Sequence, residues 1–445
     1  MARRAPFLSG RRDDAGAHHS SQRREPRIHY AAEKSPLRER VQGLGCRFLA
    51  GLGGYGVVVG NASARVTVTR SLFRDAGQGG VLFFGVDDET TTGNRSPKFG
   101  NVSWNVFKSL GRTLVHVAAV GLRAASHTYV GHNRITDVPR YAIQADTFYD
   151  LSVAGGRLST DNVFEFNVVD LACSETTDVG AFELLGSQDP ALVDFDLRNV
   201  IRYNKVSRTL GSSSSDGAHV CRGEAYDARR GCRGLAWSIY LDGAYSGAHV
   251  HGNVLDGSSK GAIIINGGGN VTFENNVVLN PKTSAVELST CWAPNDPRRA
   301  RWPGNRFERN IFALDAPTAT AYALPGPPNT AECTFIPGRL SSDGNLFSGG
   351  PDLATRPLFP SNGTLAEWQR GNATAPGARD APPFKWQPLD VASLVADAKF
   401  ADAANGQLQP DSPAFALGWL QLPDIEGAVP PPAPDEPPLL VVQAH

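Results

Sequence analysis

Short apolar runs separated by polar turns recur along the chain, and they come in groups of three. Residues 236–280 contain two passes of this unit, punctuated by Gly and Asn. The runs occupy 238–241, 249–251 and 253–255 in the first pass and 262–265, 271–273 and 276–278 in the second. Runs this short and closely spaced do not fit helices. They predict coils of a solenoid, in which each strand pairs with its copy in the next coil.

An asparagine followed by apolar residues marks the same point in each copy. These residues are Asn105, Asn133, Asn167, Asn204, Asn253, Asn276 and Asn310, with weaker outer copies at Ser71 and Asn345. Their spacing varies from 23 to 49 residues, as expected for a coil of fixed circumference with loops of variable length. Asn suits a tight corner because it tolerates left-handed backbone angles and can hydrogen-bond to its copy one coil away. The pattern favours an all-β fold, a single-stranded right-handed parallel β-helix, over a propeller or a sandwich.

The repeat does not extend over the whole chain. The N-terminal residues are polar and basic and lack the apolar stretch of a signal peptide, whereas 365–369 predicts a short helix beyond the repeats. Two long excursions, 186–197 and 207–235, interrupt the coils, and loops of that length are often functional. We divide the chain into a disordered or wrongly predicted N-terminal segment (1–43), the β-helix (44–348), a capping segment (349–428) and a Pro-rich tail (429–445).

Composition and charge narrow the classes of partner. The 445 residues carry a net charge of −1, which gives no reason to expect a nucleic-acid partner or an anionic membrane surface. No apolar run approaches the roughly 20 residues of a membrane span. We therefore expect a monomer with neither a nucleic-acid nor a membrane partner.

The cysteines and glycosylation sequons bear on the compartment. Six cysteines are present without a CxxC pattern, so we predict no metal site. Cys221 and Cys232 bracket a ten-residue charged loop, and a disulfide between them or two unrelated free thiols fit the sequence equally. Six Asn-x-Ser/Thr sequons weakly favour secretion. We expect an extracellular or secretory-pathway protein.

The first strands of four consecutive coils align as 142–146, 181–185, 238–242 and 262–266. Side chains alternate between the two faces of a strand, so every second residue should face the core. The predicted core residues are Ile143, Phe182, Leu184, Ile239, Leu241, Ile263 and Ile265. The predicted outward residues include Gln144, Asp146, Glu183, Tyr240, Asp242 and Asn266. Three carboxylates and a phenol on one exposed face exceed what solubility requires.

Glu183 and Asp242 are offset by one coil and two residues in this alignment. Neighbouring coils are about 4.8 Å apart and two residues along a strand add about 6.6 Å, so the two backbones should lie about 8 Å apart. Glycosidases place their two carboxyl groups roughly 5–5.5 Å apart for retention and roughly 6.5–9.5 Å apart for inversion. The pair is therefore compatible with a glycosidase. A hydrated acidic patch, or a calcium site built from the same oxygens, also fits the pattern.

Several motifs occur together between about 45 and 420. They are 132–143, 178–182, 199–204, 239–242, Ser246-Gly247, 252–254, and the ending 411–414 with Leu417-Gly418. As a set they resemble right-handed parallel β-helix carbohydrate-active proteins of the pectate-lyase-like superfamily, and most closely glycoside hydrolase family 141. The resemblance implies catalytic aspartates near the DxGA strand and in the IYLDD strand of that family, which carry over to Asp178 and Asp242.

Two positions depart from the family's pattern. Gly243 stands where the family has a second aspartate, and Glu183 stands where it has a tyrosine. The partner of Asp242 is therefore either Asp178 or Glu183, and Asp178 is also a candidate turn residue at the start of its strand. Arg140 lies beside the same face and could bind a substrate hydroxyl or carboxylate. His132 could bind substrate too, but anchoring a loop is the favoured role.

Three functional hypotheses follow. The first is a glycoside hydrolase that acts on a complex polysaccharide without a cofactor, in which one carboxyl protonates the leaving oxygen and a second acts as base or nucleophile. The second is a polysaccharide lyase, with Tyr240 or Arg140 reassigned to its base and Ca²⁺ neutralising a uronate. The third is a non-catalytic carbohydrate-binding protein, which an exposed ladder of aromatic residues would support.

Overall fold

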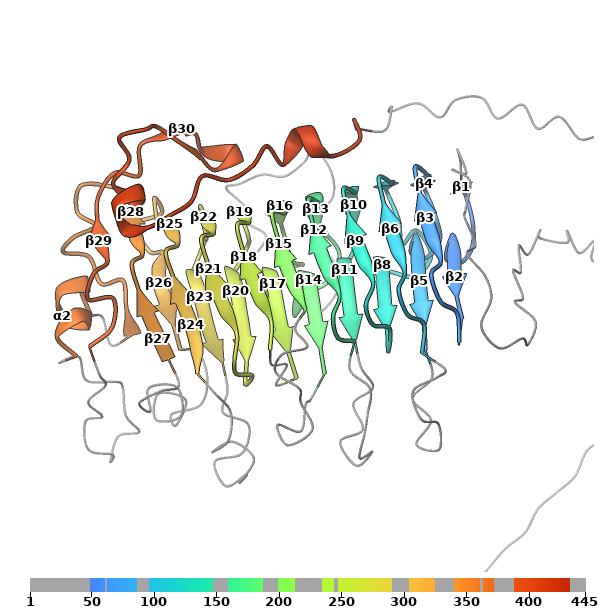
Figure 1. The fold of residues 1–445 in the computed structure, drawn as a ribbon, viewed down its shortest axis with the longest axis horizontal. Helices are drawn as coiled ribbons and strands as arrows, with labels where there is room; N and C mark the ends of the chain where they lie inside the picture. Colours follow the sequence, from blue (N-terminus) through green and yellow to red (C-terminus); the bar gives the residue numbers. More distant parts are fainter. Residues whose placement is uncertain are drawn as a thin grey trace, which may run out of the picture. The chain divides into compact units, whose positions relative to one another are not determined.

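The computed structural model describes residues 49–60, 62–85, 96–146, 159–186, 199–212, 234–243, 247–289, 304–324, 340–360, 363–371 and 388–432, all within the unit 39–445. The predicted all-β fold is confirmed. Within these residues three parallel sheets follow the chain coil by coil as a right-handed β-helix (Figure 1). The helices that lie wholly within these residues are one α-helix and three short 3₁₀-helices.

Successive coils add their strands to the three sheets in the same order. Sheet 1 contains β1 (Leu49–Ala50), β4 (Leu72–Arg74), β7 (Val106–Lys108), β10 (Arg134–Val138), β13 (Val168–Ala172), β16 (Lys205–Thr209), β19 (Val254–Asp256), β22 (Val277–Leu279), β25 (Ile311–Ala313), β28 (Leu346–Ser348) and β29 (Leu394–Val395). Sheet 2 contains β2 (Val57–Val59), β5 (Val81–Phe84), β8 (Ala118–Arg123), β11 (Tyr141–Asp146), β14 (Val179–Leu185), β17 (Ala236–Asp242), β20 (Gly261–Asn266), β23 (Ser284–Ser289) and β26 (Thr320–Ala323). Sheet 3 contains β3 (Thr67–Thr69), β6 (Asn101–Ser103), β9 (Tyr129–Gly131), β12 (Val163–Glu165), β15 (Val200–Arg202), β18 (His249–His251), β21 (Thr272–Glu274), β24 (Asn305–Glu308) and β27 (Leu340–Asp343).

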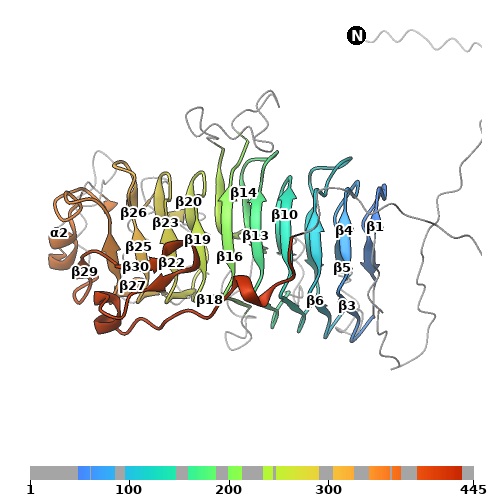
Figure 2. The ribbon, with the colours of Figure 1, turned by 90° about the horizontal axis from the view of Figure 1, so that it is seen from above.

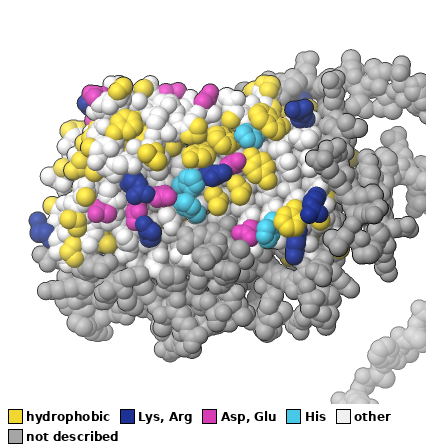
Figure 3. Space-filling view, in the orientation of Figure 1, with side chains coloured by type: hydrophobic (Ala, Val, Ile, Leu, Met, Phe, Trp, Pro, Cys, Tyr) yellow, Lys and Arg dark blue, Asp and Glu magenta, His cyan; other side chains and the backbone are white. Residues whose placement is uncertain are grey.

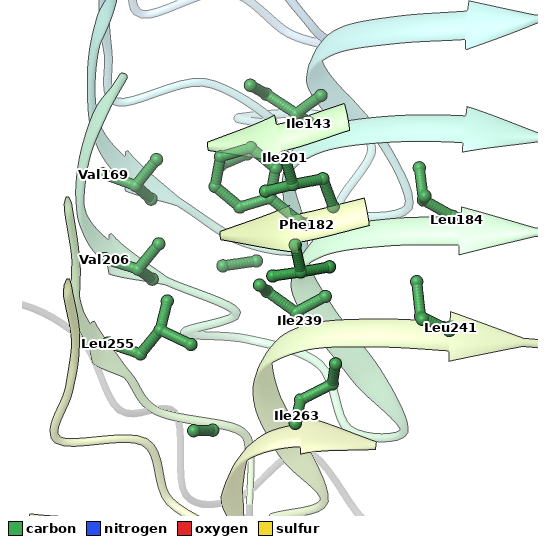
Figure 4. Packing of buried hydrophobic residues seen from close by; sticks show 14 of the residues in the cluster. Ile143, Val169, Phe182, Leu184, Ile201, Val206, Ile239, Leu241, Leu255 and Ile263 are labelled. Atoms are coloured by element: carbon green, nitrogen blue, oxygen red, sulfur yellow. The ribbon is translucent and has the colours of Figure 1, made fainter. Parts of the chain in front are cut away.

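The core lies between the sheets, and the predicted register of sheet 2 is confirmed. Ile143 pairs with Phe182, which pairs with Ile239, which pairs with Ile263. All seven predicted core residues are buried. Figure 4 shows this column packed between the sheets, opposite Val169, Val206 and Leu255 of sheet 1. Burying each such side chain contributes about 1.5–3 kcal/mol. A slip of one residue would turn the whole column toward solvent, so burial selects the register.

The repeated asparagines form a continuous buried ladder. In each coil from Asn105 to Asn310, the backbone N–H and the side-chain amide both donate to the side-chain oxygen of the next asparagine. Ser71 continues the ladder at one end, because its N–H donates to Asn105 Oδ1 at 3.0 Å. The proposed hydrogen bonding of each Asn to its copy is therefore confirmed.

The left-handed corner lies one residue earlier than we expected. Positive φ is found at the residue before each ladder asparagine, for example 60° at Trp104, 53° at Tyr203 and 66° at Gly252. The ladder asparagines themselves are not in that region. The reason is that the corner turns the chain so that the next side chain points inward, where its amide can reach the neighbouring coil.

The segment predicted as one cap, 349–428, has two parts in the structure. In the first, α2 (Leu365–Arg370) covers the end of the core, where Trp368 is fully buried and stacks on Tyr322 and Phe359. Trp368 Nε1 also donates to Asp390, whose carboxylate accepts from the last ladder residue, Asn345. This part closes both the apolar core and the asparagine ladder.

The second part, 396–432, which we call the C-terminal segment, runs back along the outer face of sheet 1 (Figures 1 and 2). It contains β30 (Phe400–Asp402), β31 (Gln407–Leu408), η4 (Ala403–Asn405), η5 (Pro413–Leu417) and η6 (Glu426–Ala428). Its apolar residues, including Trp419 and Leu422, pack on the outward Val254 and Val277. Glu426 forms ion pairs with Arg134 (2.9 Å) and Lys205 (3.0 Å).

Charged side chains on the outer face of sheet 3 are paired from coil to coil. Arg202 Nε donates to Glu165 at 2.5 Å, and His249 Nε2 lies 2.8 Å from Glu274. Arg309 also pairs with Glu274. Figure 3 shows a similar mixture of basic, acidic and histidine side chains on one face of the molecule. Such pairs contribute little stability when exposed, and the core and ladder carry more.

The ladder yields a stability prediction. Asn204→Ala should lower the free energy of unfolding by about 2–5 kcal/mol, because it leaves buried partners, including the Asn167 N–H and the Phe164 carbonyl, unsatisfied. Chemical denaturation would measure the loss. Asn405→Ala, on the C-terminal segment, should cost no more than about 0.5 kcal/mol. Equal losses for both variants would contradict the role of the ladder.

Candidate functional site

The outward side chains of β14, β17 and β20 form a polar cluster on sheet 2. Glu183 pairs in register with Tyr240, and Asp242 lies two residues further along β17. The side-chain amide of Asn266, at the end of β20, donates hydrogen bonds to Tyr240 and Asp242 of β17. Because the opposite faces of these strands are locked in the core, the four side chains converge on one patch of the outer face.

The Tyr240 hydroxyl is at the centre of the cluster. It donates to Asp178 Oδ1 at 3.2 Å and lies 3.4 Å from Asn266 Nδ2. Burial, followed by the charges of Asp242, Asp178 and Glu183, raises the pKa of Tyr240. The phenol therefore remains protonated and acts as a hydrogen-bond donor.

Asp242 is held by its own strand end and by the neighbouring coil. Its Oδ1 accepts from the Gly243 N–H at 2.6 Å and from Asn266 Nδ2 at 2.7 Å. Gly243 has φ +63°, the left-handed conformation that turns the chain out of β17 and directs its N–H at Asp242. The glycine at this position thus has a defined role beside the carboxylate. Asp242 is partly exposed to solvent.

Glu183 is the buried carboxyl of the cluster, with 3% of its surface exposed. Its Oε2 accepts from the Gly180 N–H at 3.3 Å, and the Tyr141 hydroxyl also bonds to it. Burial, opposed by the positive charge of Arg140 and assisted by the negative charge of Asp242, raises the pKa of Glu183 to about 8. Glu183 therefore carries a proton at neutral pH.

Asp178 and Arg140 complete the cluster at the start of β14. Asp178 has φ +54°, so it is a turn residue, and its exposed carboxylate nevertheless reaches Tyr240. Arg140 Nη2 donates to the Asp178 carbonyl at 3.3 Å, and its guanidinium lies 4.6 Å from the centre of the Tyr141 ring. Asp178 and Glu183, the two alternative partners of Asp242, are thus both present in the cluster.

Of the other predicted site residues, one adjoins the cluster and two do not belong to it. Gln144 is next to Glu183 in register, but Asp146 pairs with Leu185 and lies 4.0 Å from Arg123, two coils away from Asp242. His132 is at the corner between sheets 3 and 1, stacked between Trp104 (4.6 Å) and Phe166 (5.1 Å). Its Nδ1 lies 2.8 Å from the Ala428 carbonyl, so His132 anchors the C-terminal segment.

His132 therefore lies away from the cluster on sheet 2, and its contacts fit the anchoring role that the sequence favours. Position 132 directly precedes a ladder asparagine, and such positions point away from sheet 2. Cys221 and Cys232 lie outside the described residues, and Cys173 is buried with a free thiol.

Sequence reasoning missed Gly180 and Tyr141. A Cβ on Gly180 would lie 2.6 Å from the Tyr240 Cβ and 2.5 Å from the Phe182 carbonyl oxygen, so only glycine allows this approach. The sequence did contain a signal for Gly180, because this glycine lies on the strand that the alignment places beside the strand with Tyr240. Tyr141 gave none, because its position on β11 has the parity of the core residues.

The described residues contain neither a candidate metal site nor a candidate membrane-spanning helix. No group of three or more His, Cys, Asp or Glu side chains there is arranged to hold a metal ion. No helix in that part of the chain is long and apolar enough to cross a membrane.

Comparison with known proteins gives only distant similarity. No protein-family model and no curated protein matches the chain. Among solved structures, the tailspike protein of E. coli bacteriophage HK620 in complex with a pentasaccharide is 14% identical, with a TM-score of 0.42, over 72% of this chain and 49% of the tailspike. The catalytic domain of a GH87 α-1,3-glucanase in complex with nigerose is 14% identical, with a TM-score of 0.40, over 70% of this chain and 51% of that domain.

A third structure, described as a glycoside hydrolase, is 14% identical, with a TM-score of 0.33, over 65% of this chain and 37% of its own length. The chain thus spans about half the length, or less, of these three structures. The descriptions of these three structures do not show a relationship to glycoside hydrolase family 141. Similarity at this level adds nothing to the fold, which rests on the strand pairing described above.

The raised pKa of Glu183 predicts how stability depends on pH. The folded-state pKa, about 8, lies above the ordinary 4.5, so the native state binds more protons and loses stability as pH rises from about 4.5 to about 8. Glu183→Gln removes this dependence. Its stability relative to the parent should rise by about 1–4 kcal/mol between pH 5 and pH 8, measured by denaturation at each pH.

Glu426→Gln provides a control of opposite sign. Desolvation raises the pKa of Glu426, but the hydrogen bonds and positive charges of Arg134 and Lys205 together outweigh it, so the net pKa is lowered. The contribution of Glu426 to stability is therefore present at neutral pH and fades as the carboxylate is protonated in acid. A Glu183→Gln variant whose stability difference from the parent is constant across pH 5–8 would show that Glu183 is ionised throughout.

Proposed function

We propose that this chain is a glycoside hydrolase acting on a polysaccharide or oligosaccharide, with Glu183 as the proton donor and Asp242 as the base or nucleophile. The observation that carries the proposal is the contrast between these neighbouring carboxyls. Glu183 is buried and retains a proton, whereas Asp242 is partly exposed and accepts two N–H donors. Pairs of carboxyls with such divided environments are the acid and base of glycosidases.

The cluster supports each step of that reaction. Protonated Glu183 would donate to the glycosidic oxygen and become a carboxylate, which the Gly180 N–H and the positive charge of Arg140 would then stabilise. Among the described residues, both hydrogen bonds to Asp242 reach Oδ1. We therefore assign to Oδ2 either the removal of a proton from the water that attacks the anomeric carbon or the direct attack on that carbon. The register offset of one strand and two residues, about 8 Å between backbones, suits such a pair.

Asp178 is assigned a supporting role. Its carboxylate accepts a hydrogen bond from the Tyr240 hydroxyl, and its left-handed backbone forms the turn that leads into β14. The presence of Asp178 and Asp242 in one cluster is what supports a closer relationship to glycoside hydrolase family 141. Glu183 in place of the family's tyrosine would then be a substitution that supplies the acid within this chain.

The cluster is less suited to the alternative functions. A lyase needs a base and a neutralised uronate, but Tyr240 is a donor with a raised pKa, and Asp178 and Asp242 would repel an anionic sugar. A binding protein would present aromatic faces to sugars. The aromatic ladder here, Trp104, His132, Phe166 and Tyr203, stacks its rings on one another at 4.6–5.3 Å between centroids, so most faces are already covered.

Substitution of the two carboxyls tests the assignment. Asp242→Asn and Glu183→Gln should each lower kcat by about 10²–10⁴, because each removes an acid or base without changing shape. The parent rate should also fall above pH 8, where Glu183 loses its proton. Asp178→Asn should lose less than either variant, and Asp256→Asn on sheet 1 should match the parent. Near-parental turnover by Asp242→Asn would refute the proposed site.

The products distinguish a hydrolase from a lyase. The protein should be incubated with a panel of neutral and uronic polysaccharides, and both reducing ends and ultraviolet absorbance should be followed. We expect new reducing ends from a neutral polysaccharide without an unsaturated product. A rise in ultraviolet absorbance from a uronic substrate would favour the lyase instead.

A further inference from the structure

A second buried carboxyl lies on the same outer face of sheet 2. Glu287 of β23 is 1% exposed and follows Glu183, Tyr240 and Ile264 in one column of register partners. Three strand spacings separate it from Glu183, about 14 Å between backbones. This exceeds the roughly 6.5–9.5 Å of an inverting pair, so Glu287 is not a second acid or base for the same bond.

Both oxygens of Glu287 already have partners. Oε2 accepts the indole N–H of Trp237, and Oε1 lies 3.3 Å from Lys260 Nζ. A substrate would have to break these contacts to reach the carboxylate. We therefore assign Glu287 the role of holding the Trp237 indole in place through this hydrogen bond.

Trp237 is held in a slot made by two glycines. Its register partners on the adjacent strands are Gly180 and Gly261. A Cβ on Gly261 would lie 3.1 Å from Trp237 Cδ1 and 2.7 Å from the Ser284 carbonyl oxygen. The slot and the hydrogen bond to Glu287 together determine where the indole ring lies.

The indole ring in turn supports Tyr240. The two ring centroids are 5.0 Å apart, and with Ile264 these residues form a small hydrophobic cluster separate from the main core. The supported ring carries the hydroxyl that donates to Asp178 and lies beside Asn266, the residue that also holds Asp242.

We propose that Trp237 and Glu287 are positioning residues, a brace that holds Tyr240 so that its hydroxyl orders Asp178, Asn266 and Asp242 for the reaction. The inference rests on the proposed hydrolase function. Neither residue touches the substrate in this arrangement. Loss of the brace therefore slows turnover and changes its pH dependence, while the affinity for substrate is retained.

Three variants test the brace. Trp237→Phe keeps an aromatic ring but removes the indole N–H, and Glu287→Leu removes its acceptor. Each should lower kcat about tenfold, with KM changed less than about twofold, because misplacement of a catalytic group costs turnover. Each should also shift the pH profile of kcat. Glu287→Gln retains an acceptor for the indole N–H and should rescue kcat to within about threefold of the parent.

The chain offers a matched control at the far end of the core. Trp368 Nε1 donates to buried Asp390 at 2.9 Å, the same type of bond in a place without contact to the cluster. Trp368→Phe should lower thermal stability but leave the pH profile unchanged. If Trp237→Phe and Trp368→Phe lose stability alike and neither alters the pH profile, Trp237 is merely structural and the brace is wrong.

A readout without substrate separates the brace from the proposed function. The protein is labelled with 3-fluorotyrosine, and the ¹⁹F signal of Tyr240 is identified by its loss in Tyr240→Phe. The signal should move in Trp237→Phe and Glu287→Leu but not in Trp368→Phe. If it moves although the parent hydrolyses no polysaccharide, the brace stands and the hydrolase proposal fails. If the parent is active and the signal stays in place in all three variants, the brace is overturned.

Discussion

The register between coils is the constraint on which the rest of the structure depends. It is held twice, by the columns of apolar side chains between the sheets and by the buried asparagine ladder. The apolar columns and the asparagine ladder both oppose a slip of one coil along the next. The ladder does so because each amide must lie opposite its copy in order to bond to it. Loops of very different length can therefore separate the coils while corresponding residues remain aligned.

The register that fills the core also determines which polar side chains become neighbours on the outer face of sheet 2. Once Phe182, Ile239 and Ile263 are inside, the residues between them must point outward and lie next to one another. Glu183, Tyr240 and Asp242 become neighbours although 59 residues of sequence separate the first from the last. The missing side chains of Gly180 and Gly261 then make room for Tyr240 and Trp237, which no alternation of polar and apolar residues requires.

Two carboxyls on the outer face of sheet 2, Glu183 and Glu287, are buried, and their surroundings give them different roles. Burial raises the pKa of both. Glu287 has a direct ion pair with Lys260 and a hydrogen bond from Trp237, so its charge is compensated locally. Glu183 makes no direct ion pair with any residue that the structure describes, and it keeps its proton to about pH 8. Burial without a direct ion pair therefore costs stability as the pH rises from about 4.5 to about 8, and it is also the condition for a proton donor at neutral pH.

The sequence by itself determined the coil, the asparagine ladder, the register of sheet 2 and the division of its residues into inward and outward, because each is a repeating local pattern imposed by strand geometry. Only the tertiary structure decided which outward residues form a cluster. It brought Tyr141 and Arg140 from one coil and Asp178 from the start of the next, placed His132 at a distant corner under the C-terminal segment, and buried Glu183 while leaving Asp242 partly exposed. Those outcomes depend on desolvation and on contacts between coils, and neither is encoded in the alternation of residues along one strand.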